Sequence, residues 1–133
     1  MMQVYNSQSV PSDVKRQVAN WKGAKRASTG YACFEFASPA DDILVFSENG
    51  QVTGTALLCA SQGDTDAYGI DMLYLAYFAT AKRNIGKLVL KSILEYAHQA
   101  GFEISLIALP TSIGFYEKCE FLYKVGEAGF SSV

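Results

Sequence analysis

The sequence lacks several features that would place it in a common functional class. Its longest apolar run, around residues 70–79, is far shorter than the roughly 20 residues that span a bilayer. Its single histidine and three cysteines show no Cys-x-x-Cys or Cys–His spacing typical of a metal site. No basic segment followed by an apolar core appears near Met1, so we expect no signal peptide. The isolated Cys33, Cys59 and Cys119 are expected to be buried and reduced, which favours a cytoplasmic location.

Charge and composition are also unremarkable. The formal net charge of -2 gives no general attraction to nucleic acid or to an anionic membrane, so neither partner is expected. Hydrophobic residues make up 50% of the chain and charged residues 18%, as in ordinary globular proteins. With 133 residues, the chain fits a single domain over residues 1–133. The polar segment 61–66 is turn-rich but too short to separate two domains.

The N-terminal part predicts few regular elements. A short strand is expected at residues 2–5. A helix should follow Pro11, with Ser9 or Ser12 as its N-cap, and should end at Gly23. The basic and polar segment 22–30 is expected to be a loop or a frayed turn.

A run of strands is expected next. Residues 31–36 are rich in aromatic side chains, which favours a strand, and residues 43–46 are a clearer one. Asn49-Gly50 then predicts a tight two-residue hairpin, because both residues tolerate positive φ. Residues 52–59 would return antiparallel, and residues 70–78 would form a long central strand.

The pattern then changes from a strand period to a helix period. Apolar residues recur at helical spacing, with charged residues on the other face. The apolar positions are Ile85, Leu88, Val89, Ile93, Tyr96 and Ala97. Gly101 is placed as the glycine that ends this helix, with Phe102 packing back on it.

The remaining elements complete the predicted fold. A buried strand is expected at 104–109, parallel to 70–78 because a crossover helix joins them. A shorter helix would run from Pro110 to about Cys119, followed by closing strands at 121–125 and 129–133. The fold class is therefore α+β, with a mixed, mostly antiparallel central sheet flanked by helices.

The first segment with chemical potential is the loop at residues 79–87, which leads into the long helix. A helix N-terminus exposes free N–H groups and carries about +0.5 charge, so it suits a phosphate. Lys82, Arg83 and Lys87 add positive charge. The alternative is a basic helix start with a tight turn and no ligand.

The second segment is the run Phe-Tyr-Glu-Lys-Cys-Glu-Phe at residues 115–121. By composition alone it could be an amphipathic helix packed on the sheet. In this order, however, the two segments resemble the GCN5-related N-acetyltransferase (GNAT) family, over residues 43–125. That family often carries Phe-Tyr-Glu-Lys-Leu-Gly-Phe after the buried strand. The runs are identical except at Cys119 and Glu120.

The loop departs from the family pattern Gln/Arg-x-x-Gly-x-Gly/Ala. If Gly86 is the second glycine, Asn84 stands at the first and Ala81 at the Gln/Arg position. Asparagine tolerates a left-handed backbone, so Asn84 is an acceptable substitute. Alternatively, one residue is deleted and Lys82 or Arg83 takes the basic role. Leu109 or Pro110 also stands where the family often has asparagine.

The resemblance implies a GNAT-like acyl-CoA acyltransferase fold with acetyl-CoA as co-substrate. The thioester would lie where the strands 70–78 and 104–109 separate, and the acceptor amine would attack it directly. Tyr116 matches the tyrosine that often protonates the leaving thiolate. The residues that would bind acetyl-CoA are Leu75, Ala76 and Tyr77 on the strand and Lys82, Arg83, Asn84, Ile85, Gly86 and Lys87 in the loop.

The general base is not evident. Asp71 and Glu35 are candidates, each with the alternative of a solvent-facing strand residue, and a water chain could serve instead. His98 is expected on the exposed side of the long helix. A basic group also gathers near the N-terminus, which is either a solvated surface or an aid to binding an acidic acceptor or the CoA 3′-phosphate. Its members are Lys15, Arg16, Lys22, Lys25 and Arg26.

The favoured function is therefore N-acetylation of a small-molecule or peptide amine. An acyl-CoA-binding sensor without turnover is the alternative from another class. Acylation of a macromolecule, such as a tRNA-bound amino acid, is a third hypothesis. A Rossmann domain is disfavoured because no Gly-x-Gly-x-x-Gly follows a first strand. The family is often dimeric, so a homodimer is a candidate assembly.

Overall fold

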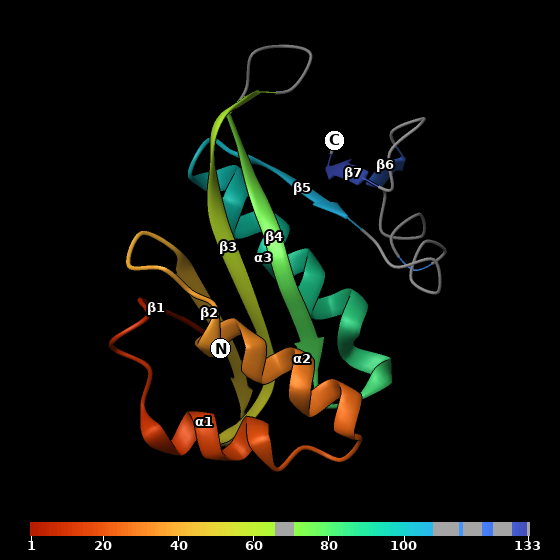
Figure 1. Ribbon diagram of the computed structural model, residues 1–133. Helices are drawn as coiled ribbons and strands as arrows, with labels where there is room; N and C mark the ends of the chain where they lie inside the picture. Colours follow the sequence, from red (N-terminus) through yellow and green to blue (C-terminus); the bar gives the residue numbers. More distant parts are fainter. Residues whose placement is uncertain (66–70, 108–114, 116–120, 124–128, 133) are drawn as a thin grey trace.

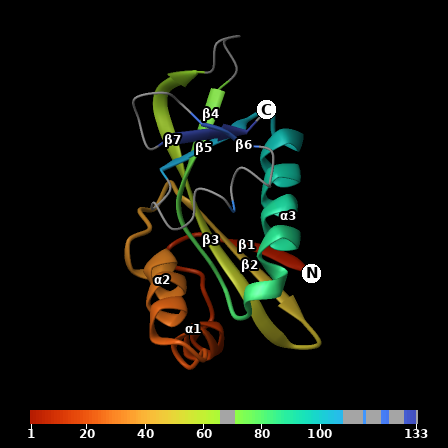
Figure 2. The same cartoon turned by 90° about the vertical axis from the view of Figure 1, so that its right-hand side faces the viewer.

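The computed structural model describes residues 1–65, 71–107, 115, 121–123 and 129–132. They form a seven-stranded sheet in the order β1-β2-β3-β4-β5-β7-β6. The helices α1 and α2 cover one face and α3 covers the other (Figures 1 and 2). The elements are β1 (Met2–Tyr5), α1 (Ser12–Ala19), α2 (Ala24–Glu35), β2 (Asp42–Glu48), β3 (Gln51–Thr65), β4 (Asp71–Thr80), a short 3₁₀ helix η1 (Arg83–Ile85), α3 (Gly86–Gln99), β5 (Glu103–Ile107), β6 (Phe121–Tyr123) and β7 (Gly129–Ser132).

The strand directions confirm the predicted α+β class. Only β4 and β5 pair in parallel among the described strands, and every other described pair is antiparallel. Strand β3 extends to Thr65, so the segment predicted as a polar turn is in large part strand. The helix predicted at 110–119 lies outside the described residues.

The hairpin between β2 and β3 confirms the prediction from its sequence. Asn49 and Gly50 have φ angles of 52° and 77°. Two successive positive φ values match the twist of the flanking strands, which is why Asn-Gly is favoured there. This turn therefore sets the register of the β2–β3 pair.

The predictions for residues 22–36 were wrong. The expected loop and aromatic strand form one helix, α2. Its buried residues Gly30, Cys33 and Phe34 recur at helical spacing and pack toward the sheet and α1. A Cβ on Gly30 would lie 2.7 Å from Trp21 Cζ3, so this glycine allows the close approach of α2 to the end of α1. Tertiary packing here outweighs the strand preference of the aromatic residues.

The predicted caps of α1 were also wrong. Pro11 is the N-cap residue, with no side-chain capping bond, and Asn20 follows the last turn in place of Gly23. Ser9 Oγ instead accepts a hydrogen bond from the Asn6 N–H at 3.0 Å. A proline before the first turn fits because it has no N–H that would remain unpaired.

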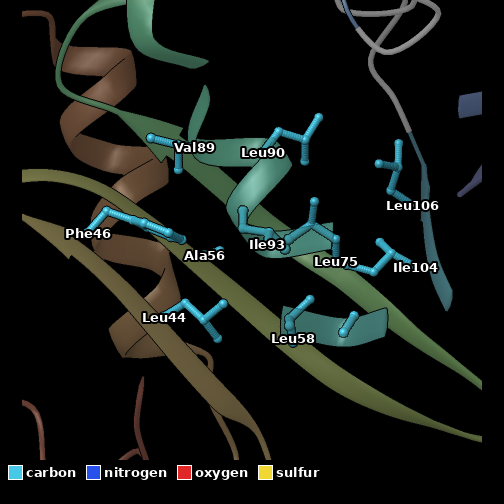
Figure 3. Close-up of a cluster of buried hydrophobic side chains, with 11 residues drawn as sticks. Leu44, Phe46, Ala56, Leu58, Leu75, Val89, Leu90, Ile93, Ile104 and Leu106 are labelled. Atoms are coloured by element: carbon cyan, nitrogen blue, oxygen red, sulfur yellow. The ribbon is translucent and has the colours of Figure 1, made fainter. Parts of the chain in front are cut away.

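The core has two layers, one on each face of the sheet. Between the sheet and α3, side chains of β2, β3, β4 and β5 gather around Leu90 and Ile93 (Figure 3). The other layer lies under α1 and α2 and includes Val18, Cys33 and Leu57. Leu88 was predicted on the apolar face of α3, but it is 68% exposed.

The C-terminal end of α3 confirms the predicted glycine stop. Gly101 has a φ of 85°, which a side chain would disfavour. Its N–H donates to the His98 carbonyl at 3.0 Å, and the Phe102 N–H donates to the Ala97 carbonyl at 2.9 Å. This pair of bonds is a Schellman motif. Phe102 packs against the α3 core layer, as expected.

Candidate functional site

The parallel strands β4 and β5 separate after a short stretch of pairing. The paired residues run from Met72 with Glu103 to Tyr74 with Ser105. Beyond that point, Leu106 and Ile107 of β5 pair with β7. Figure 1 shows β5 turning away from β4. The structure therefore agrees with the gap that the family resemblance implied.

A β-bulge interrupts β4 directly after the last of these pairs. Leu58 pairs with Leu75 and Leu57 with Tyr77, which leaves Ala76 without a partner on β3. Leu75 packs in the α3 layer, whereas Ala76 and Tyr77 both pack in the α1–α2 layer. Two successive residues thus face the same side, as expected at a bulge. The three strand residues predicted to bind acetyl-CoA lie at this irregularity.

The loop after β4 ends in a helix start without a side-chain cap. No capping bond is described at η1 or at α3, and neither has an acidic residue in its first turn. Lys82, Arg83 and Lys87 are all exposed around this helix start. The positive end of the helix dipole and these cations therefore add to each other. This arrangement suits a bound anion.

The backbone at Asn84 differs from its predicted conformation. Asn49 is the only non-glycine residue with positive φ in the part of the chain that the structure describes. Asn84 lies inside η1, so its tolerance for a left-handed backbone is not used. Gly86 has helical angles of -57° and -43°.

Gly86 instead allows a close contact with the second motif. A Cβ on Gly86 would lie 3.3 Å from Phe115 Cε1. The Phe115 ring also stacks on Phe78 of β4, with ring centroids 6.4 Å apart. The two segments singled out in the sequence therefore meet in space. Tyr116, the predicted acid, lies outside the described residues.

Arg26 of α2 reaches the end of β4, a contact that sequence reasoning missed. Its Nη1 donates to the Thr80 carbonyl at 3.3 Å. Thr80 Oγ1 donates to the Lys82 carbonyl at 2.7 Å, and the Ala81 N–H donates to the Thr53 carbonyl at 2.9 Å. The segment around Arg26, expected to be a loop, is helical, and its sequence pattern did not indicate this contact.

The proposed bases and the histidine are exposed. Asp71 opens β4, and Glu35 is the last residue of α2 and not a strand residue as predicted. His98 is exposed, which confirms its prediction. Next to Glu35, Phe36 stacks on Tyr77 with ring centroids 5.7 Å apart, so the C-terminal end of α2 lies near the bulge.

The described thiols are poor nucleophiles. Burial raises the pKa of Cys33 to about 12, although the hydrogen bond between its thiol and Thr55 opposes this shift. Burial, with the nearby Asp41 carboxylate, raises the pKa of Cys59 to about 11. Cys59 is only half-buried, which corrects its predicted full burial, and both thiols are free. The thiolate, which is the reactive form, is therefore scarce near neutral pH.

A hollow of about 430 Å³ opens beside the end of β4. Two of its lining residues bind the backbone of Val52: the Gln17 side-chain oxygen accepts from the Val52 N–H, and the Trp21 indole N–H donates to the Val52 carbonyl. Its lining is Asp13, Arg16, Gln17, Asn20, Trp21, Gln51, Val52 and Ala81.

The described residues contain no helix long and apolar enough to cross a membrane and no acidic, cysteine or histidine cluster suited to a metal.

Comparisons with known proteins give a family and a fold. A family model described as "Acetyltransferase (GNAT) family" matches residues 8–121. No relative among the curated proteins matches the sequence. Tetrahymena GCN5 aligns at a TM-score of 0.65 and 11% identity, over 99% of this chain and 94% of that one. Escherichia coli ElaA aligns at a TM-score of 0.66 and 11% sequence identity, over 100% of this chain and 99% of that one.

A third solved structure contains a ligand. It is a variant of the AtaT toxin bound to acetyl-CoA and to the C-terminus of the antitoxin AtaR. It aligns at a TM-score of 0.63 and 16% identity, over 98% of this chain and 91% of that one. At such identities these likenesses show the fold.

Proposed function

Because this chain belongs to the GNAT acetyltransferase family, we propose that it transfers an acetyl group from acetyl-CoA to a primary amine by direct attack. The observation that carries the proposal is the separation of β4 from β5 after Tyr74, with a bulge at Ala76 beside it. An acyl-CoA needs such an opening, since its thioester must reach backbone groups that a fully paired sheet would hide.

Acetyl-CoA would bind along β4 and the loop that follows it. The backbone amides near Leu75–Tyr77 would hold the pantetheine arm and polarise the acetyl carbonyl, as in an oxyanion hole. The diphosphate would contact the N–H groups between Lys82 and Lys87, where no side-chain cap competes. Acetyl-CoA bound to the AtaT toxin, which shares the fold, supports this choice of co-substrate.

The chemical step needs no covalent intermediate on the protein. The amine nitrogen attacks the carbonyl carbon, the C–S bond breaks, and the CoA thiolate takes a proton from Tyr116. The amine nitrogen loses a proton to Glu35, to Asp71 or to a water chain. The raised pKa values of Cys33 and Cys59 argue against an acetyl-cysteine route at neutral pH.

The acceptor is proposed to be a small-molecule or peptide amine in the cytoplasm, with the enzyme as a monomer or homodimer. The net charge of -2 gives no support for a nucleic-acid partner. Exposed Phe36, stacked on Tyr77 near the bulge, offers an apolar surface close to the proposed reaction point.

The test has a binding part and a turnover part. Calorimetry should show binding of acetyl-CoA at micromolar concentration, and heat denaturation should show stabilisation by it. Thiol release should then be measured against polyamines, amino acids, aminoglycosides and peptides. No binding at millimolar CoA would refute the proposal. Binding without thiol release for any amine would favour the acyl-CoA-binding sensor instead.

A further inference from the structure

We propose that Arg26 of α2 binds a phosphate of CoA and replaces, in space, the side chain that is missing at Ala81. The inference rests on the proposed function. The family pattern has glutamine or arginine at the position that Ala81 occupies when Gly86 is aligned with its second glycine. The structure brings an arginine from a different element to the neighbouring residue.

The position of Arg26 is fixed by a contact with the last residue of β4. Its Nη1 donates to the Thr80 carbonyl at 3.3 Å. Thr80 is only 6% exposed and directly precedes Ala81. The side-chain stem of Arg26 passes Gly23, where an added Cβ would lie 3.6 Å from Arg26 Cδ. The guanidinium is therefore held at the end of β4, where the loop that leads into α3 begins.

Most of the guanidinium remains available to a ligand. An arginine carries five N–H donors in a planar fork. The Thr80 carbonyl is the only hydrogen-bond acceptor of Arg26 within the described part of the chain. Arg26 is half-buried and has no carboxylate partner among the residues that the structure describes. Such a guanidinium is well prepared for a phosphate, which it can bind through two parallel hydrogen bonds.

Ala81 itself cannot supply this contact. Its side chain is a methyl group, and its N–H already donates to the Thr53 carbonyl at 2.9 Å. Lys82 and Arg83 are exposed and follow Ala81 in the segment that leads into α3. Arg26 would therefore add positive charge from α2 to the positive charge that the loop itself supplies.

A purely structural role for Arg26 predicts a different result. If its guanidinium only fastens α2 to β4, its removal lowers stability and leaves the affinity for CoA unchanged. If it binds a phosphate, its removal weakens CoA binding, and a basic side chain restored nearby brings the affinity back. Ala81 borders an open hollow of about 430 Å³, so an arginine at that position has room.

The experiment is calorimetric titration of CoA into four proteins: the wild type, Arg26→Ala, Lys91→Ala and the double variant Arg26→Ala/Ala81→Arg. We expect Arg26→Ala to weaken binding about tenfold to a hundredfold, the range for lost hydrogen bonds to a charged group. Lys91→Ala removes the same charge from the exposed face of α3 and should bind as the wild type does. The double variant should recover at least half of the affinity for CoA that Arg26→Ala loses, measured as the logarithm of the dissociation constant.

A second ligand identifies the phosphate. The same titrations are repeated with 3′-dephospho-CoA. If Arg26→Ala weakens the binding of this ligand as much as it weakens the binding of CoA, Arg26 contacts the diphosphate. If Arg26→Ala and the wild type bind this ligand equally well, Arg26 contacts the 3′-phosphate. If Arg26→Ala does not fold, Arg26→Gln keeps the stem and takes its place. Wild-type affinity in the folded variant overturns the inference. Failure of the wild type to bind CoA would instead refute the proposed function.

Discussion

Gly86 and Phe115 lie against each other where α3 begins, so close that a Cβ on Gly86 would be 3.3 Å from Phe115 Cε1. This contact joins the start of α3, after the loop at residues 81–85, to the second motif, which begins at Phe115. The Phe115 ring rests on Phe78, next to the end of β4. Tyr116 follows Phe115 directly in the sequence, so we expect a change at this contact to affect the proposed acid.

Gly86→Ala should lower turnover more than it lowers stability. Alanine in a helix is favoured over glycine by up to about 1 kcal/mol, which offsets part of the cost of moving Phe115. The displaced ring belongs to the residue next to the proposed acid in the sequence, so we expect its displacement to disturb catalysis. We expect kcat to fall about tenfold, with a change in unfolding free energy below about 1 kcal/mol. Steady-state kinetics and urea denaturation measure the two effects.

The control for that variant is a double-mutant cycle. Phe115→Leu removes the ring edge that the new Cβ would approach, so Gly86→Ala should cost less in the Phe115→Leu background. Independent effects of the two substitutions on kcat would contradict a role for this contact.

Tyr116→Phe should lower kcat by about 10²-fold, the lower range for general acid catalysis, and leave the affinity for acetyl-CoA nearly unchanged. The phenylalanine keeps the ring and removes the proton donor. Tyr5→Phe, on the edge strand β1, is the matched control and should behave as the wild type. Full turnover by Tyr116→Phe would remove Tyr116 from the mechanism.

The Tyr96 hydroxyl donates to Asp42 Oδ2 at 3.0 Å and links α3 to the start of β2. Burial, and then the Asp42 carboxylate, raise the pKa of Tyr96 above its ordinary value near 10. The folded state therefore holds the phenol proton more tightly than the unfolded state. Its contribution to stability is present below the unfolded pKa and is lost as pH rises through the folded pKa.

This linkage predicts a decline in melting temperature above about pH 10. Tyr96→Phe should lower the melting temperature near neutral pH and make the alkaline decline shallower. Calorimetric melting of both proteins at several pH values checks this. Parallel declines in the two proteins would mean that Tyr96 does not contribute to the alkaline loss.

Gly30→Ala should destabilise the fold by about 1–3 kcal/mol, as expected when an atom is forced into a packed region. The new Cβ would lie 2.7 Å from Trp21 Cζ3 and 3.0 Å from Val18 Cγ1. The cost of this overlap exceeds the gain in helix propensity from glycine to alanine, which is at most about 1 kcal/mol. Ser28→Ala, exposed on the same helix, should change stability by less than about 0.5 kcal/mol.

Urea denaturation followed by the fluorescence of Trp21, the chain's single tryptophan, reports on this region directly. Equal midpoints for Gly30→Ala and the wild type would show that α1 and α2 can separate at little cost.

The candidate site could be predicted in its sequential parts only. The loop from Lys82 to Lys87 and the run beginning at Phe115 were found because each is a contiguous pattern. Their contact through Gly86 could not be found, since it depends on how the chain folds between them. The bulge at Ala76 was also missed, because no single residue type marks it.

The sequence by itself determined the features whose cause is local. Asn49-Gly50 fixes its hairpin through allowed backbone angles, and Gly101 ends α3 for the same reason. The helical spacing of apolar residues around Ile93 identifies α3 because a single helix repeats every 3.6 residues.

Only the tertiary structure decided the features that depend on distant partners. The helix α2 packs closely on the end of α1 because Gly30 leaves room for the Trp21 ring, a contact between two separate elements. The separation of β4 from β5 and the meeting of Arg26 with Thr80 likewise join segments far apart in the chain. Local propensity amounts to tenths of a kcal/mol per residue, whereas packing and burial contribute whole kcal/mol, so packing decides where the two conflict.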